Sequence, residues 1–152
     1  MKKFISLALL LVSSIAYALP SPSGWVVDEG AKLSKQSKAY IYSTSDALAK
    51  GGGPEVAVAV VNSISPENIE SYSIKLAEYW KVGKKGKDNG VLFVVAVKER
   101  KLRIEVGYGL EGKLNDAKAG QILDRYVVPS LKAGNWDKGI VDGYNAILQA
   151  IK

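Results

Sequence analysis

The chain has 152 residues, a formal net charge of +6 at pH 7, and neither histidine nor cysteine. This length suits one domain with a hydrophobic core. Without histidine and cysteine, a Ser-His-Asp triad, a cysteine nucleophile and the usual zinc sites are excluded, which leaves carboxylate, amide, hydroxyl and amine chemistry.

The N-terminus has the pattern of a secretory signal peptide. Residues 1–3 are basic, residues 4–15 are apolar, and residues 16–18 form a small-x-small cleavage site. The apolar run is shorter than the roughly 20 residues of a membrane-spanning helix. We therefore expect residues 1–18 to be removed, leaving a periplasmic or secreted protein with no transmembrane anchor in the mature chain.

The first half of the mature chain predicts a helix and a buried strand. Residues 19–24 include two prolines and indicate an extended lead-in to a single domain over residues 25–152. Ser34 is placed to cap a helix that ends at the three glycines after Lys50. Residues 55–61 are continuously apolar after the first position, as in a strand covered on both faces.

The middle of the chain predicts a βαβ unit followed by a β-hairpin. Ser65, Pro66 and Glu67 form a strong start signal for a helix that runs to Trp80. The apolar residues 91–97 predict a second buried strand, parallel to the first through a right-handed crossover. A polar reversal and the alternating residues 102–106 then add an antiparallel strand.

The last third of the chain predicts two further helices. The first includes residues 119–126 and is kinked or ended near Pro129, and the second covers residues 138–151. Four helices are enough to cover both faces of the predicted strands. We expect a three-layer α/β/α sandwich over a short mixed β-sheet that contains the βαβ unit and the β-hairpin.

The hairpin should bring two polar loops to the same end of the sheet. The loop before its first strand, residues 83–90, and the loop after its second, residues 107–115, must lie together. Oxygen-bearing side chains there suit Ca²⁺ or Mg²⁺. A purely structural reading stays open, in which these residues form turns and cap the next helix. The side chains concerned are Asp88, Asn89, Glu111, Asn115 and Asp116.

Lysines in the first loop suggest a second chemistry. Lys84, Lys85 and Lys87 lie beside Asp88 and could bind a phosphate group. A lysine-rich turn that is simply hydrated is the alternative.

The glycines 107, 109 and 112 match the dinucleotide-binding spacing G-x-G-x-x-G. That spacing acts in the first βα turn of a parallel array, whereas here the preceding strand is the return arm of a hairpin. We therefore expect no nucleotide site, only a loop that requires positive φ angles. Tyr108 is expected to fold back on the core rather than line a pocket, and Trp136 to anchor the start of the last helix rather than stack on a ligand. Asp28 either braces the first helix or reaches the acidic loops.

Two segments carry a family resemblance. Trp80-x-x-Gly83-Lys-Lys-Gly-Lys-Asp-Asn-Gly90 and Arg103-Ile-Glu-Val-Gly-Tyr-Gly-Leu-Glu-Gly112-x-Leu-x-Asp116 resemble the TPM domain, over about residues 25–151. That family includes the thylakoid acid phosphatase, photosystem II repair proteins and receptor modulators. The resemblance implies an α/β/α sandwich and a divalent-cation site, typically for Ca²⁺. The implied metal residues are Asp88, Asn89, Glu111 and Asp116.

The resemblance also suggests two alternative functions. The first is a secreted or periplasmic accessory module that binds Ca²⁺ or Mg²⁺ and works with another extracytoplasmic or membrane protein. The alternative is a metal-assisted phosphomonoesterase, in which the lysines neutralise phosphate and Asp88 or Glu111 acts as the base. The mild positive charge comes without a basic helix or an aromatic-basic surface, so nucleic acid is not an expected partner.

Overall fold

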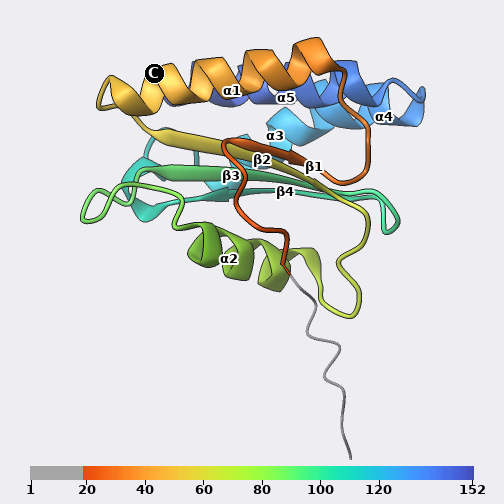
Figure 1. The fold of residues 1–152 in the computed structure, drawn as a ribbon, viewed down its shortest axis with the longest axis horizontal. Coiled ribbons are helices and arrows are strands. Elements are labelled where there is room, and N and C mark those ends of the chain that lie inside the picture. Colours follow the sequence, from red (N-terminus) through yellow and green to blue (C-terminus); the bar gives the residue numbers. More distant parts are fainter. Residues whose placement is uncertain (1–18) are drawn as a thin grey trace, which may run out of the picture.

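The computed structural model describes residues 19–152, so the predicted signal peptide, residues 1–18, lies outside the described residues. The sheet has four strands in the order β1-β2-β3-β4 (Figure 1). The first three are parallel, and β4 is antiparallel to β3. The strands are β1 (Val26–Asp28), β2 (Glu55–Val61), β3 (Gly90–Ala96) and β4 (Lys101–Val106).

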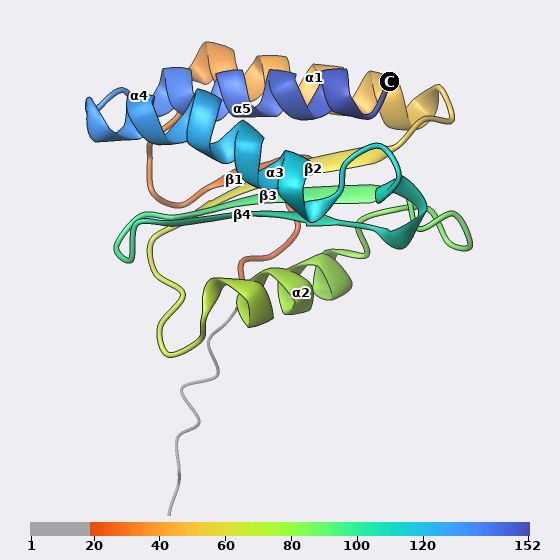
Figure 2. The same ribbon diagram turned by 180° about the vertical axis from the view of Figure 1, so that it is seen from behind.

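Helices cover both faces of the sheet, which confirms the expected three-layer α/β/α sandwich (Figures 1 and 2). The helix α2 (Ile69–Trp80) lies alone on one face. The opposite face packs against α1 (Lys35–Lys50), α3 (Asp116–Ile122), α4 (Val128–Lys132) and α5 (Trp136–Ala150).

The central strands are apolar throughout because alternate residues enter different cores. In β3, Val91, Phe93 and Val95 join the core of α1, α3 and α5. Their neighbours Leu92 and Val94 join the smaller core under α2. A strand buried on both faces has no position for polar residues, which is why its pattern loses the usual alternation.

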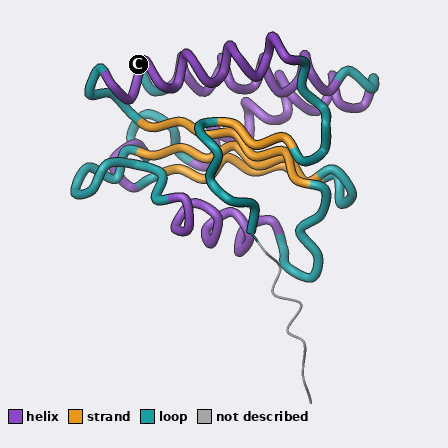
Figure 3. Tube along the Cα trace, in the orientation of Figure 1, coloured by secondary structure: helices purple, strands orange, loops and turns teal. Residues whose placement is uncertain are grey.

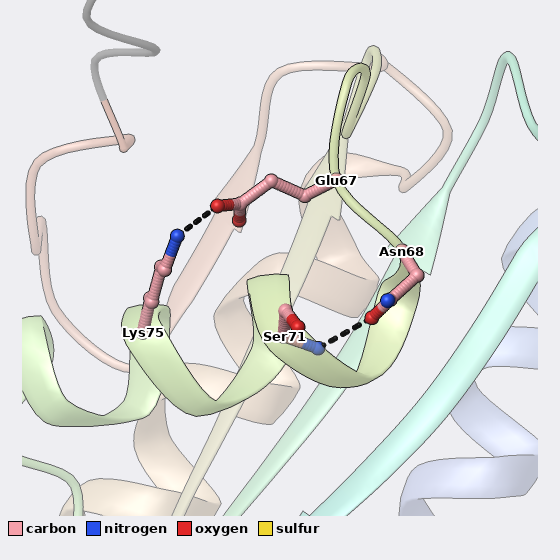
Figure 4. A network of polar contacts seen from close by, with 4 residues as sticks. All are labelled: Glu67, Asn68, Ser71 and Lys75. Carbon is pink, nitrogen blue, oxygen red and sulfur yellow. Dashed lines mark hydrogen bonds and ion pairs between the residues drawn. The ribbon is translucent and has the colours of Figure 1, made fainter.

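The expected cap of the first helix is confirmed, and that of the second is wrong. Ser34 Oγ accepts the Ser37 N–H at 3.1 Å before α1. The helix α2 begins three residues later than Pro66, where Asn68 Oδ1 accepts the Ser71 N–H at 2.8 Å (Figure 4). Residues 64–67 instead form a turn closed by the Glu67 N–H and the Ile64 carbonyl at 2.9 Å. The cap of α2 is therefore Asn68, whose backbone has the extended conformation that is typical of a capping residue.

The predicted third helix is longer than expected and passes through Pro129. It starts at Asp116, widens into a π-helical turn at Leu123–Val127, and continues as α4 to Lys132. Proline lacks an N–H, so it fits at the start of α4 directly after the irregular turn. The last helix starts at Trp136, two residues before the predicted start, and this tryptophan does lie at its beginning.

The sheet has two ends of different construction. We call the end formed by residues 81–89 and 107–115 the loop end, and the other, formed by the β3–β4 turn at residues 97–100 and the turns after β1 and β2, the hairpin end (Figures 1 and 3). Since β1 is parallel to β2, Asp28 lies at the hairpin end. Across residues 19–152, no helix has the length and apolar character needed to cross a membrane.

Candidate functional site

The two loops of the loop end are in direct backbone contact. The Gly107 N–H donates to the Gly90 carbonyl at 2.7 Å, and the Gly109 N–H donates to the Asp88 carbonyl at 2.9 Å. A Cβ atom at Gly107 would lie 2.3 Å from the Asp88 carbonyl oxygen, and one at Gly109 would lie 2.2 Å from that of Lys87. The expectation of positive φ angles is wrong here, because these glycines are required by close backbone approach.

Three of the predicted metal residues expose their side chains at this end. Asp88, with a φ of 46°, lies in the first loop, Glu111 follows the short 3₁₀ helix Tyr108–Leu110, and Asp116 is the first residue of α3. All three are exposed. Across residues 19–152, no three acidic side chains are grouped closely enough to hold a metal ion. The structure thus brings the loops together without clustering these carboxylates.

The amide side chains at the loop end have structural contacts. Asn89 Oδ1 accepts the Lys84 N–H at 2.8 Å, and its Nδ2 donates to the Gly53 carbonyl at 3.5 Å. Asn115 Oδ1 accepts the Lys118 N–H at 2.9 Å and caps α3. Both amides therefore hold the local backbone, as the structural reading of these residues expected.

The three lysines of the first loop are not equivalent. Lys84 Nζ donates to the Ala49 carbonyl at 2.8 Å and to the Gly53 carbonyl at 3.1 Å, at the end of α1. Lys85 and Lys87 are exposed. Lys84, Lys85 and Asp88 also line an open depression of about 480 Å³ beside the end of α2. Two of the three ammonium groups are thus free to meet a ligand.

Tyr108 does not fold back on the core, so that expectation is wrong. Its side chain is 80% exposed, whereas Leu110, two residues later, is buried. The backbone of Gly107 and Gly109 lies against residues 87 and 88, which leaves the core position to Leu110. Tyr108 is an aromatic surface residue beside the acidic loops.

The hairpin end contains a second polar group whose carboxylates are already hydrogen-bonded. The Asp28 carboxylate accepts the N–H groups of Lys32 at 3.0 Å and Leu33 at 2.9 Å. Of its two possible roles, Asp28 therefore braces the turn before α1. Glu99 likewise accepts the Ile64 N–H at 2.7 Å and the Ser63 hydroxyl at 2.9 Å.

A cavity of about 360 Å³ lies at the hairpin end between the β3–β4 hairpin and α4. Arg100, Lys101 and Lys132 contribute to its lining together with Trp136. The sequence prediction missed this group because its members are separated by about 30 residues, and no local motif links them. Only the positions of Trp136 after a turn and of basic residues at the hairpin tip could have signalled it.

Comparisons with known proteins agree with this fold. The TPM domain model matches residues 26–150. The solution structure of the N-terminal domain of a P. gingivalis protein is 32% identical, with a TM-score of 0.76 over 83% of this chain and 80% of that one.

Two more distant solution structures share the fold. The N-terminal domain of a Corynebacterium glutamicum protein is 15% identical, with a TM-score of 0.63 over 86% of this chain and 81% of that one. A protein of the psychrophilic bacterium Bizionia argentinensis is 22% identical, with a TM-score of 0.56 over 78% and 81%. A search of curated proteins finds no match. The family match and the P. gingivalis structure together show that this chain belongs to the TPM domain family.

Proposed function

We propose that the loop end binds a divalent cation, Ca²⁺ or Mg²⁺, and that the protein acts as a periplasmic or secreted accessory module for another extracytoplasmic or membrane protein. The observation that supports this most is the backbone bond between Gly109 and Asp88, which holds the two acidic loops together. Each loop can then supply oxygen ligands to one ion.

The exposed side chains at the loop end offer the type of oxygen ligand that calcium prefers. Asp88, Glu111 and Asp116 have no hydrogen-bonded or ion-paired side-chain partner within residues 19–152. Ca²⁺ takes six to eight oxygens from carboxylates, backbone carbonyls and water in flexible arrangements. Such an ion accepts carboxylates that are spread over two joined loops, because it does not require a rigid, closed set of ligands. Asn89, the fourth implied ligand, would contribute only after a rearrangement, because its amide contacts Lys84 and Gly53 and its backbone carbonyl accepts the Glu55 N–H at 3.0 Å.

Calcium titration followed by backbone NMR tests the proposal. The amides of residues 84–90 and 107–116 should shift together on adding Ca²⁺ or Mg²⁺. Glu111→Gln and Asp88→Asn should each weaken binding several-fold, whereas Asp124→Asn, an exposed acid on the π-helical turn, should not. Shifts confined to one loop, shifts elsewhere, or none would contradict a shared site.

Metal-assisted phosphomonoester hydrolysis is the second candidate function. The exposed ammonium groups of Lys85 and Lys87 beside Asp88 favour it, because they could neutralise a phosphate near a bound cation. The cation would polarise a phosphoryl oxygen and acidify a water, and Asp88 or Glu111 would accept its proton.

An assay with p-nitrophenyl phosphate, with and without Ca²⁺ or Mg²⁺, separates the two functions. The enzyme hypothesis expects cation-dependent turnover that Asp88→Ala abolishes and Lys85→Gln with Lys87→Gln reduces. If pure wild-type protein shows no turnover, or if turnover survives Asp88→Ala, the enzyme hypothesis is contradicted. The binding module is then the remaining proposal.

A further inference from the structure

The cavity at the hairpin end combines an apolar floor with a cationic rim. Val95, Leu102, Val128 and Leu131 supply aliphatic lining, and Trp136 adds an indole ring. Lys101 is paired with Ala96 in the hairpin, and Ala96 lies in the core under α2, so the Lys101 side chain leaves the opposite face of the sheet. The rim cations are therefore Arg100 and Lys132. A volume of about 360 Å³ lies within the range of small-molecule sites.

The rim cations have no anionic partner in the protein. Within residues 19–152, the ion pairs involve other basic residues, namely Lys50, Lys75, Arg103 and Lys138. A further cation, Lys32, lies over the Trp136 ring with its Nζ 4.8 Å from the ring centroid. The cavity is thus surrounded by positive charge.

Within residues 19–152, nearby acids form no ion pair with these cations, and their carboxylates accept hydrogen bonds from other groups. Asp137, next to Trp136, accepts the Ser34 N–H at 2.7 Å and the Ser37 hydroxyl at 3.0 Å. Asp28 and Glu99 are held by backbone N–H groups. No acidic residue is among those that line the cavity.

We propose that this cavity binds a small amphipathic carboxylate, with its hydrocarbon chain on the aliphatic floor beside Trp136 and its carboxylate between Arg100 and Lys132. The cavity adjoins the carboxyl end of β3, and ligands of open α/β sheets bind outside the carboxyl ends of the parallel strands. The aliphatic floor disfavours a fully hydrated anion such as free phosphate. The unpaired cations disfavour a neutral lipid, because the charges would stay uncompensated.

Octanoate is a suitable probe, with 1-octanol and octylamine as neutral and cationic molecules of the same chain length. In backbone NMR titrations of the mature protein, octanoate should shift the amides of residues 95–102 and 128–136. Its affinity should exceed that of 1-octanol by about fourfold, since two exposed ion pairs contribute roughly twofold each. Octylamine should bind more weakly than either.

Charge variants test the rim directly. Arg100→Gln, Lys101→Gln and Lys132→Gln combined should lower octanoate affinity about fourfold, which is the effect expected from Arg100 and Lys132. Lys101→Gln alone should leave the affinity within about twofold, because its side chain lies on the α2 face. The matched control is Lys118→Gln with Arg125→Gln, which removes cations from the open groove between α3 and α5. This control should leave octanoate affinity within about twofold.

Several outcomes would overturn the proposal. Absence of binding, shifts centred on the α3–α5 groove, or equal affinity for octanoate and 1-octanol would each do so. Unchanged octanoate affinity in the triple variant would do so as well, and thermal unfolding of that variant verifies that it remains folded. None of these results bears on the cation site, which lies at the other end of the sheet.

Discussion

The two ends of the sheet leave opposite charges free, although carboxylates hold the backbone at both, since Glu55 accepts the Gly83 N–H at 2.9 Å at the loop end. At the loop end, the Lys84 ammonium and the Asn89 amide hold the backbone, and Asp88 and Glu111 are exposed. At the hairpin end, Asp28 and Glu99 hold the backbone, and the cations around the cavity are unpaired. The chemistry offered to a ligand therefore depends on which side chains the fold has already engaged, rather than on local composition.

The largest effect should come from separating the loops of the loop end. In Gly109→Ala, the new Cβ atom would lie 2.2 Å from the Lys87 carbonyl oxygen, so one of the two loops must move. We expect a loss of roughly 2–3 kcal/mol in the free energy of unfolding, measured by urea denaturation. Gly112→Ala is the matched control, since nothing lies within 4 Å of its Cβ position. Equal stability of both variants would contradict the close approach.

Alkaline pH should weaken the hairpin end through Tyr72 of α2. Burial, with a smaller contribution from the nearby carboxylates Glu29, Glu67 and Glu99, raises the pKa of this hydroxyl to about 12. Because the folded-state pKa exceeds the unfolded value near 10, the stabilisation is complete below pH 10 and is lost as the pH rises to about 12. The loss should reach up to about 3 kcal/mol for a shift of two pKa units.

Urea unfolding at pH 9 and pH 11.5 measures this loss. Tyr72→Phe lacks the titrating hydroxyl and should retain more of its pH 9 stability at pH 11.5 than the wild type does. If both proteins lose the same amount, another group controls the alkaline transition.

The carboxylates of the two ends should respond differently to the same substitution. Asp28→Ala leaves the Lys32 and Leu33 N–H groups without their acceptor and should cost about 1–3 kcal/mol. Glu111→Ala should change stability by less than about 0.5 kcal/mol in the absence of metal, because its carboxylate has no such contacts and its φ of −60° suits alanine. Urea denaturation in the presence of a chelator compares them, and similar costs would remove the distinction.

The smallest effect distinguishes the lysines of the first loop. Lys84→Met removes the ammonium that binds the Ala49 and Gly53 carbonyls and should cost about 1 kcal/mol. Lys85→Met should be neutral within about 0.5 kcal/mol, since Lys85 is exposed. Thermal unfolding of both variants provides the measurement, and a destabilised Lys85→Met would show that its ammonium also has a structural role.

Local signals predicted most of the fold. The unbroken apolar runs at residues 55–61 and 91–97 indicated strands buried on both faces, and the structure confirms this. The start of α2 was misplaced because Ser65 and Asn68 are both good caps, and tertiary contacts of residues 64–67 decide between them. The third helix was expected to kink or end near Pro129, and it changes into a π-helical turn just before this residue and ends at Lys132.

The candidate site was only partly predictable. Hairpin geometry alone placed residues 83–90 and 107–115 together, and the backbone contact between Gly109 and Asp88 confirms that placement. The binding of a cation there stays a prediction. The contacts of Asn89 and Lys84 with Gly53 could not be foreseen, because Gly53 is more than 30 residues away in the chain.

The sequence by itself determined the layered architecture and the meeting of the two acidic loops, because both follow from hydrophobic period and chain connectivity. Tertiary structure alone decided which charged side chains are engaged and which are free. It joined Arg100, Lys132 and Trp136 around one cavity, and it engaged Asp28 in the turn before α1. Such pairings depend on long-range packing, whose distances no local pattern encodes.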